Sequence, residues 1–413
     1  MSASDFARAA LLNPRVTVCV GSGGVGKTTV AAALALEAAR RGRRVLVLTI
    51  DPARRLADAL GVAALGNQPE ALPNAALAAL GVPPQGSLCA LMLDMKRTFD
   101  DLVERFAETP ETRARILENP IYQHISEALA GSIEYSAMEK VYELDEQRAY
   151  DLIVVDTPPS QHALDFLEAP QRLLEFLDSR IVHMLIHPAF VAGRIGFRVF
   201  QRGARRVLKL LERVTGIGFL EDVSEFLLAF EGMSEGFRER AGGVRALLLG
   251  RDTAFVLVAG AGRDSVQQAL QLRTRLAGFG TSLAGVLVNR VRIWPGGGSP
   301  PELAGAQDSL GALAAALATS EGADFPAQAA AQAALDAAAG YAAFARRDAR
   351  ETAALRDVIE KQGSYWGAIP ELADDVHDLA GLARIAHAIF ASEGDGGREA
   401  PHAGEPHART VPD

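Results

Sequence analysis

A glycine-rich segment near the N-terminus carries the residue types that bind nucleotide phosphates. It reads Gly21-Ser-Gly-Gly-Val-Gly-Lys-Thr-Thr29. Glycines there allow backbone conformations that a Cβ would block, so successive N–H groups face one anion. Lys27 is expected to reach the β- and γ-phosphates, and the Thr28 hydroxyl to ligate Mg²⁺. We expect these residues to bind a nucleoside triphosphate: Gly21, Gly23, Gly24, Val25, Gly26, Lys27, Thr28 and Thr29.

The flanks of this segment support the same interpretation. A β-branched run, Val16–Val20, precedes it, and an Ala- and Leu-rich stretch from Thr28 to about Arg41 follows. A strand, a glycine loop and a helix form the context in which such a loop binds phosphate, because the helix N-terminus adds partial positive charge. A glycine-rich turn without a ligand would not require both flanks.

A carboxylate for the Mg²⁺ shell is expected at the end of a neighbouring strand. Leu152-Ile-Val-Val-Asp156 supplies it, since a strand end in a parallel sheet lies at the carboxyl edge beside the phosphate loop. The alternative is an ordinary strand-end aspartate. The next segment, which contains His162, is where a loop that senses the γ-phosphate would lie.

Asp51 follows a second apolar run, Val45–Ile50, and is also expected at the carboxyl edge. Its position suits a carboxylate that orients the attacking water, because phosphoryl transfer depends on in-line positioning. The alternative is an N-cap for a helix beginning near Pro52. Both interpretations stay open, since one residue can fill both roles.

The sequence around Asn289 bears on the choice of base. GTPases of this general architecture read guanine with Asn/Thr-Lys-x-Asp after a late strand. Here Asn289 is followed by Arg290, and the Lys and Asp are absent. Adenine is therefore favoured.

Apolar runs recur between stretches of helical character and predict a doubly wound, mostly parallel α/β sheet, that is, a P-loop NTPase core with an inserted α-helical subdomain. The predicted strands are Val16–Val20, Val45–Ile50, Leu88–Leu93, Leu152–Val155, Phe255–Val258, Leu283–Val288 and Tyr365–Ile369. The core is assigned to residues 14–95, 151–170 and 252–391, the helical subdomain to 96–150 and 171–251, and a disordered tail to 392–413. Ala304 to about Ala354 is so rich in alanine that we expect a thinly packed helix.

The overall composition limits the possible partners and the compartment. A net charge of −9 over 413 residues argues against general nucleic-acid binding. The two cysteines, Cys19 and Cys89, lie in apolar runs and indicate a reduced, cytoplasmic protein with buried thiols. We find no signal peptide and no run long enough to span a membrane.

The motifs together resemble the ArsA/GET-type ATPases of the deviant Walker-A class, the family of the arsenite-pump ATPase and the tail-anchored-protein targeting factor. The overall character is most similar to the bacterial anion-transporting ATPase branch. The resemblance rests on five segments: Gly21–Thr29, Thr49–Ala59, Asp156–His162, Val288–Arg290 and Ile369–Val376.

The resemblance implies a Mg-ATP switch that dimerises face to face across its nucleotides. It implies that Asp51 polarises the water, that Asp156 holds the Mg²⁺ shell, and that Asn289 and the Pro370 backbone surround adenine, with Arg290 beside them. Asp51 and Pro52 fall in the first switch, and His162 in the second.

Some departures from the family are equally informative. The family loop carries a signature lysine at the position of Ser22, which raises the question of how transition-state charge is neutralised. Arg54 or Arg55 could substitute, or either could lie on an exposed helix surface. The zinc-binding CxxC pair is absent, and two separate cysteines cannot supply the thiolates that arsenite requires, so arsenite binding is rejected.

The predicted helical insertion suggests partners without identifying one. Residues 172–214 are dense in large apolar side chains, which suits a hydrophobic client or, more simply, packing of the subdomain or a dimer interface. Basic residues recur from Arg194 to Arg213 at helical spacing, which suits an anionic membrane surface, an acidic partner or a solvated helix face.

The leading interpretation is a cytoplasmic, ATP-hydrolysing dimeric switch that transmits nucleotide state through its helical subdomain. One alternative is a targeting chaperone for hydrophobic or membrane segments. Another is the nucleotide-binding subunit of a heterodimer with a paralogue, an idea that Ser22 motivates. A metabolic kinase ranks last, because no acceptor pocket is marked in the sequence.

Overall fold

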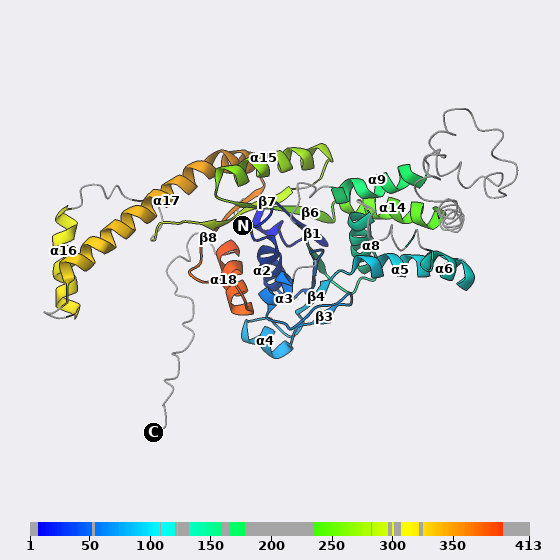
Figure 1. Cartoon of the computed structure of the whole chain (residues 1–413), viewed down its shortest axis with the longest axis horizontal. Helices are drawn as coiled ribbons and strands as arrows, with labels where there is room; N and C mark the ends of the chain where they lie inside the picture. Colours follow the sequence, from blue (N-terminus) through cyan, green and yellow to red (C-terminus); the bar gives the residue numbers. More distant parts are fainter. Residues whose placement is uncertain are drawn as a thin grey trace, which may run out of the picture.

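The computed structural model describes residues 7–51, 54–107, 109–119, 122, 132–158, 165–177, 234–281, 283–295, 300, 307–321 and 325–390. An eight-stranded sheet lies at the centre, in the order β3-β4-β2-β5-β1-β6-β7-β8 (Figure 1). The strands are β1 Val16–Val20, β2 Arg44–Thr49, β3 Glu70–Ala71, β4 Ser87–Met92, β5 Leu152–Asp156, β6 Thr253–Gly260, β7 Leu283–Val291 and β8 Tyr365–Pro370.

All neighbouring strands run parallel except β3, which pairs antiparallel with β4. The seven predicted strands are all present, and the predicted doubly wound α/β fold is confirmed. The two-residue β3 was not predicted, because Glu70 and Ala71 are both exposed and carry no apolar pattern.

The helices are α2 Lys27–Arg40, α3 Arg55–Leu60, α4 Asn74–Ala79, α5 Met95–Phe106, α6 Pro110–Leu117, α8 Ser132–Glu146, α9 Asp165–Leu177, α14 Ser234–Leu249, α15 Arg263–Gly278, α16 Gln307–Glu321, α17 Ala327–Lys361 and α18 Leu379–Phe390. None in the described ranges is long and apolar enough to cross a membrane.

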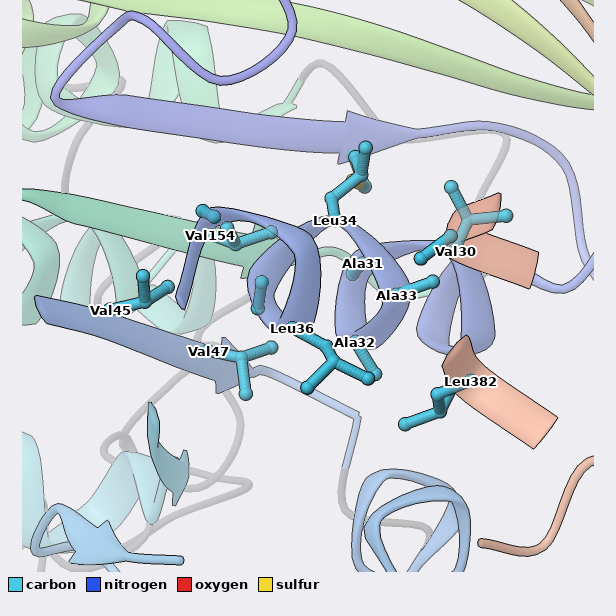
Figure 2. Packing of buried hydrophobic residues seen from close by; sticks show 14 of the residues in the cluster. Val30, Ala31, Ala32, Ala33, Leu34, Leu36, Val45, Val47, Val154 and Leu382 are labelled. Atoms are coloured by element: carbon cyan, nitrogen blue, oxygen red, sulfur yellow. The ribbon is translucent and has the colours of Figure 1, made fainter. Parts of the chain in front are cut away.

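Both faces of the central strands β1, β2, β5, β6 and β7 are buried, which explains why these strands are apolar without alternation. On one face α2 packs against β2 and β5, and Leu36, Val47 and Val154 belong to the same buried apolar cluster (Figure 2). Its many alanines let the helix lie close to the strands, and Leu382 of α18 closes the far side. This packing holds the N-terminus of α2 at the carboxyl edge of β1.

The opposite face carries a second apolar core that includes Val18, Leu48 and Val155. Helices α8, α9 and α14 contribute to this core, and together with α5 and α6 they gather on one side of the sheet (Figure 1). The buried residues of α8, α9 and α14 pack in the same core as the strands. A separate inserted helical subdomain remains a prediction.

On the other side of the molecule, α16 and α17 form an arm that extends away from the sheet (Figure 1). The predicted Ala-rich helix therefore occurs as two helices, and α17 buries only a few of its 35 residues. The base of the arm is fixed by Asp348 of α17, which accepts hydrogen bonds from the backbone N–H and the guanidinium of Arg292.

Several sequence-based predictions lie outside the described residues. These are the switch residues Pro52 and His162, most of the apolar stretch 172–214, the basic run Arg194–Arg213 and the tail 392–413. Of the two cysteines, Cys19 is buried as predicted, whereas Cys89 is only partly buried.

Candidate functional site

The glycine loop connects the end of β1 to the start of α2. Gly24 and Gly26 have φ values of 76° and 87°, which lie in the left-handed region that favours glycine. A Cβ on Gly26 would lie 2.2 Å from Asn289 Nδ2, and one on Gly21 would lie 2.1 Å from the Val258 carbonyl oxygen. The loop therefore needs glycine both for its turn and for its close approach to β6 and β7.

Lys27 is buried at the first position of α2. Its ammonium donates a hydrogen bond of 2.9 Å to the Ser22 carbonyl, so the side chain folds back along the loop. Burial lowers the pKa of Lys27, while the carboxylates of Asp156 and Asp51 act in the opposite direction. An anion placed in the loop would find this charge already in position.

Asp156 lies at the carboxyl end of β5 and is fully buried. Its Oδ2 accepts hydrogen bonds from Thr28 Oγ1 at 2.7 Å and from Thr49 Oγ1 at 2.9 Å. Its Oδ1 is buried and has no hydrogen-bond partner among the described residues. Burial raises the pKa of Asp156 to about 6, against the two hydroxyl donors and Lys27.

This arrangement fits a Mg²⁺ site. A buried carboxylate oxygen that lacks a partner is costly unless a cation or donor satisfies it. Mg²⁺ prefers oxygen ligands and is usually held by one or two protein groups together with phosphates and waters. Asp156 and Thr28 are the side chains that would hold it.

Asp51 follows β2 at the same edge of the sheet, and its backbone N–H donates to Thr49 Oγ1 at 3.2 Å. Helix α3 begins only at Arg55, with Arg54 at its N-cap and no side-chain cap. The interpretation of Asp51 as the N-cap of a helix near Pro52 is therefore wrong. The carboxylate instead forms an ion pair with Arg55, with Oδ2 and Nη1 3.3 Å apart.

Two adjoining cavities extend from the glycine loop. The first, about 350 Å³, has Lys27, Thr28, Asp51 and Arg55 among its lining residues. The second, about 320 Å³, is lined by residues that include Asn289 and Pro370. Both share Gly26, Thr29, Arg290, Asp375 and Val376.

Part of the glycine loop, from Gly24 to Thr29, thus meets Asn289 and Pro370 in one continuous depression at the carboxyl edge. Gly21 and Gly23 instead line a separate cavity beside β6 and α15. Asn289, however, uses its amide within the protein. Nδ2 donates to the Val25 carbonyl at 2.9 Å, and Oδ1 accepts from the Arg290 N–H at 3.0 Å. Asn289 therefore braces the glycine loop against the end of β7.

Two parts of this site were not predicted. Thr49 pairs in register with Asp156 across neighbouring strands, and the only signal was a threonine at the end of an apolar run. The segment Asp374–His377 also lines the depression; most of it fell within the family resemblance at Ile369–Val376, but no role in the site was predicted for it. The two aspartates Asp374 and Asp375, which follow the last strand, were only a weak signal of a binding site.

Comparison with known proteins agrees with this geometry. The sequence profile of the family described as Anion-transporting ATPase matches residues 14–295. A putative arsenical pump-driving ATPase of Halobacterium salinarum is 32% identical over 160 residues, which are 38% of this chain and 24% of that protein. ATPase GET3 of Malassezia globosa is 31% identical over 155 residues, 38% of this chain and 42% of that protein.

The matches to these two named ATPases therefore span less than half of either relative. A longer match, 30% identical over 284 residues, covers 67% of this chain and 62% of an uncharacterized protein of Streptomyces coelicolor. The family profile covers the glycine loop, β5 and the Asn289 segment in one continuous match. The chain belongs to the Anion-transporting ATPase family.

Proposed function

We propose that this chain is a Mg²⁺-dependent ATPase that converts ATP and water to ADP and phosphate. The observation that carries the proposal is the group formed by Thr28, Thr49 and Asp156. One carboxylate oxygen accepts both hydroxyls, while the other is buried without a described partner beside the glycine loop. Most buried side-chain polar atoms have a hydrogen-bond partner in the protein or an ordered water, so the second oxygen of Asp156 favours a bound cation.

In this proposal the glycine-loop N–H groups and Lys27 bind the phosphates, and Thr28 and Asp156 hold the metal. When bound, Mg²⁺ neutralises negative charge on the β- and γ-phosphate oxygens. Asp51, with a side chain that is 13% exposed, orients the attacking water from the end of β2. Asn289 keeps the loop in place through Val25.

ATP is proposed in preference to GTP, because Arg290 and Val291 follow Asn289 in place of the guanine-reading pattern. Titration calorimetry with ATP, ADP and GTP, with and without Mg²⁺, tests this proposal. We expect Mg²⁺-dependent binding of ATP that is lost in Lys27→Ala. Equal affinity for GTP would contradict the base preference, and unaltered ATP binding by Lys27→Ala would contradict the site.

We further propose that nucleotide state controls association with a partner, either a second copy or a paralogue. The support for this proposal is the family resemblance. The relatives' names specify an ATPase and a pump-driving ATPase and say nothing about assembly. Light scattering of Asp51→Asn, with ADP and then with Mg-ATP, is the test, because blocked hydrolysis traps the ATP state. A shift to a dimer indicates a homodimer, and a monomer with ATP bound would contradict self-association.

A further inference from the structure

Few basic side chains line the first cavity, the one that contains Lys27 and Thr28. Among the described residues that line it, the lysine and arginine side chains are Lys27, Arg55 and Arg290. Lys27 contacts the loop itself, and Arg290 pairs with Asp375 at 3.6 Å on the side shared with the second cavity. Position 22, within the loop, holds an uncharged serine.

Arg55 is placed differently from the other two. Its guanidinium is 59% exposed, lies on the first residue of α3 and faces Asp51. It is close enough to Lys27 to contribute to the lowered pKa of that ammonium. The two cations therefore flank the same phosphate-binding space from the loop and from α3.

Hydrolysis of a phosphoanhydride requires positive charge where negative charge develops on the γ-phosphate oxygens. Water forms a bond to the γ-phosphorus while the bond from phosphorus to the β–γ bridging oxygen breaks, and its electron pair leaves with ADP. The proton of the water passes to Asp51 and then to solvent. Besides a bound Mg²⁺, Lys27 supplies one positive side-chain charge for this change.

We propose that Arg55 is a catalytic residue that supplies the second charge from within the same chain. In the structure its guanidinium is held by Asp51, the carboxylate proposed to orient the water. Transfer of the guanidinium from Asp51 to the γ-phosphate places the arginine on the reacting group and frees the carboxylate to accept the proton. Until a triphosphate binds, the Asp51 carboxylate and the Arg55 guanidinium thus neutralise each other in one ion pair.

This inference rests on the proposed ATPase function, and its test separates the two. Phosphate release by wild type, Arg55→Ala, Arg55→Lys and Arg54→Ala is measured together with ATP binding and thermal unfolding. Arg54 is the matched control, because it is an exposed neighbouring arginine that does not line the cavity in the described part of the chain.

We expect Arg55→Ala to lower kcat by about 10²- to 10³-fold, with the affinity for ATP changed less than about threefold. Binding of ADP with aluminium fluoride, which mimics the transferring phosphoryl group, is lost in the same variant. Added guanidinium ion restores part of its rate, Arg55→Lys keeps an intermediate rate, and Arg54→Ala matches wild type.

An active wild type with an equally active Arg55→Ala would overturn the role of Arg55 and leave the ATPase function standing. A loss of ATP affinity that accounts for the whole fall in rate would also overturn it, because the arginine would then act in the ground state. A wild-type chain that binds no ATP would instead overturn the proposed function.

Discussion

The Thr28 hydroxyl donates a hydrogen bond of 2.7 Å to Asp156 Oδ2, which joins the first turn of α2 to the carboxyl end of β5. The two residues are 128 positions apart in the chain. Only the parallel pairing of β1 with β5, in which Cys19 lies opposite Asp156, brings them together. The hydroxyl, the carboxylate and the glycine loop thus depend on one strand register.

Thr28→Ala removes a proposed metal ligand and one of the two hydroxyl donors to Asp156 Oδ2. We expect Mg²⁺-dependent hydrolysis to fall by about 10²-fold or more, since the substituted side chain cannot coordinate. Thr28→Ser is the control, because it keeps the hydroxyl. The rate is measured as a function of Mg²⁺ concentration, and a Thr28→Ala variant with the wild-type Mg²⁺ response would contradict this role.

The features that the sequence predicted well depend on local pattern. The strand–loop–helix unit from Val16 to Arg40 and the aspartate at the end of β5 were predicted, because an apolar run followed by a polar residue marks a strand end. The start of α3 was predicted near Pro52 and lies at Arg55. Helix starts depend on local backbone geometry that Asp followed by Pro does not determine.

Specific side-chain contacts could not be predicted. The bond from Asn289 to Val25 and the ion pair of Asp51 with Arg55 depend on rotamers and loop positions, and neither leaves a periodic signal. Thr49 was missed for the same reason, since its role exists only in register with Asp156.

Asp156→Asn should stabilise the nucleotide-free protein at neutral pH. The folded-state pKa of about 6 lies above the ordinary value near 4, so the native state resists ionisation more than the unfolded state does. The stability that the protonated Asp156 carboxyl contributes is fully present below about pH 4 and is lost as the pH rises through 6.

We therefore expect Asp156→Asn to unfold with a free energy about 1–3 kcal/mol above that of wild type at pH 8. The difference should shrink as the pH falls towards 4. Urea unfolding at pH 4, 6 and 8, without nucleotide or metal, measures it. A variant less stable than wild type at pH 8 would contradict the burial of an ionised carboxylate.

Asn289→Ala distinguishes bracing of the loop from recognition of the base. The change leaves the Val25 carbonyl and the Arg290 N–H without their partner and should cost about 1–3 kcal/mol of stability. If Asn289 braces the loop, the affinities for ATP and GTP fall by the same factor. A loss confined to ATP would show that the amide reads adenine instead.

Gly26→Ala and Gly24→Ala form a matched pair. Both glycines have positive φ, which costs a residue with a Cβ about 1–2 kcal/mol. The Gly26 Cβ would also strike Asn289 Nδ2, whereas nothing lies within 4 Å of one on Gly24. We expect Gly26→Ala to lose more stability and more nucleotide affinity, as measured by thermal unfolding and calorimetry; equal effects would contradict the Asn289 contact.

Phosphate release from ATP by the purified chain alone, with Mg²⁺ and with chelator, tests whether this chain is a Mg²⁺-dependent ATPase. Lys27→Ala serves as the control for contaminating activity. We predict steady release that requires Mg²⁺ and disappears in the variant. A chain that binds Mg-ATP yet releases no phosphate, or whose release is unchanged in Lys27→Ala, would contradict it.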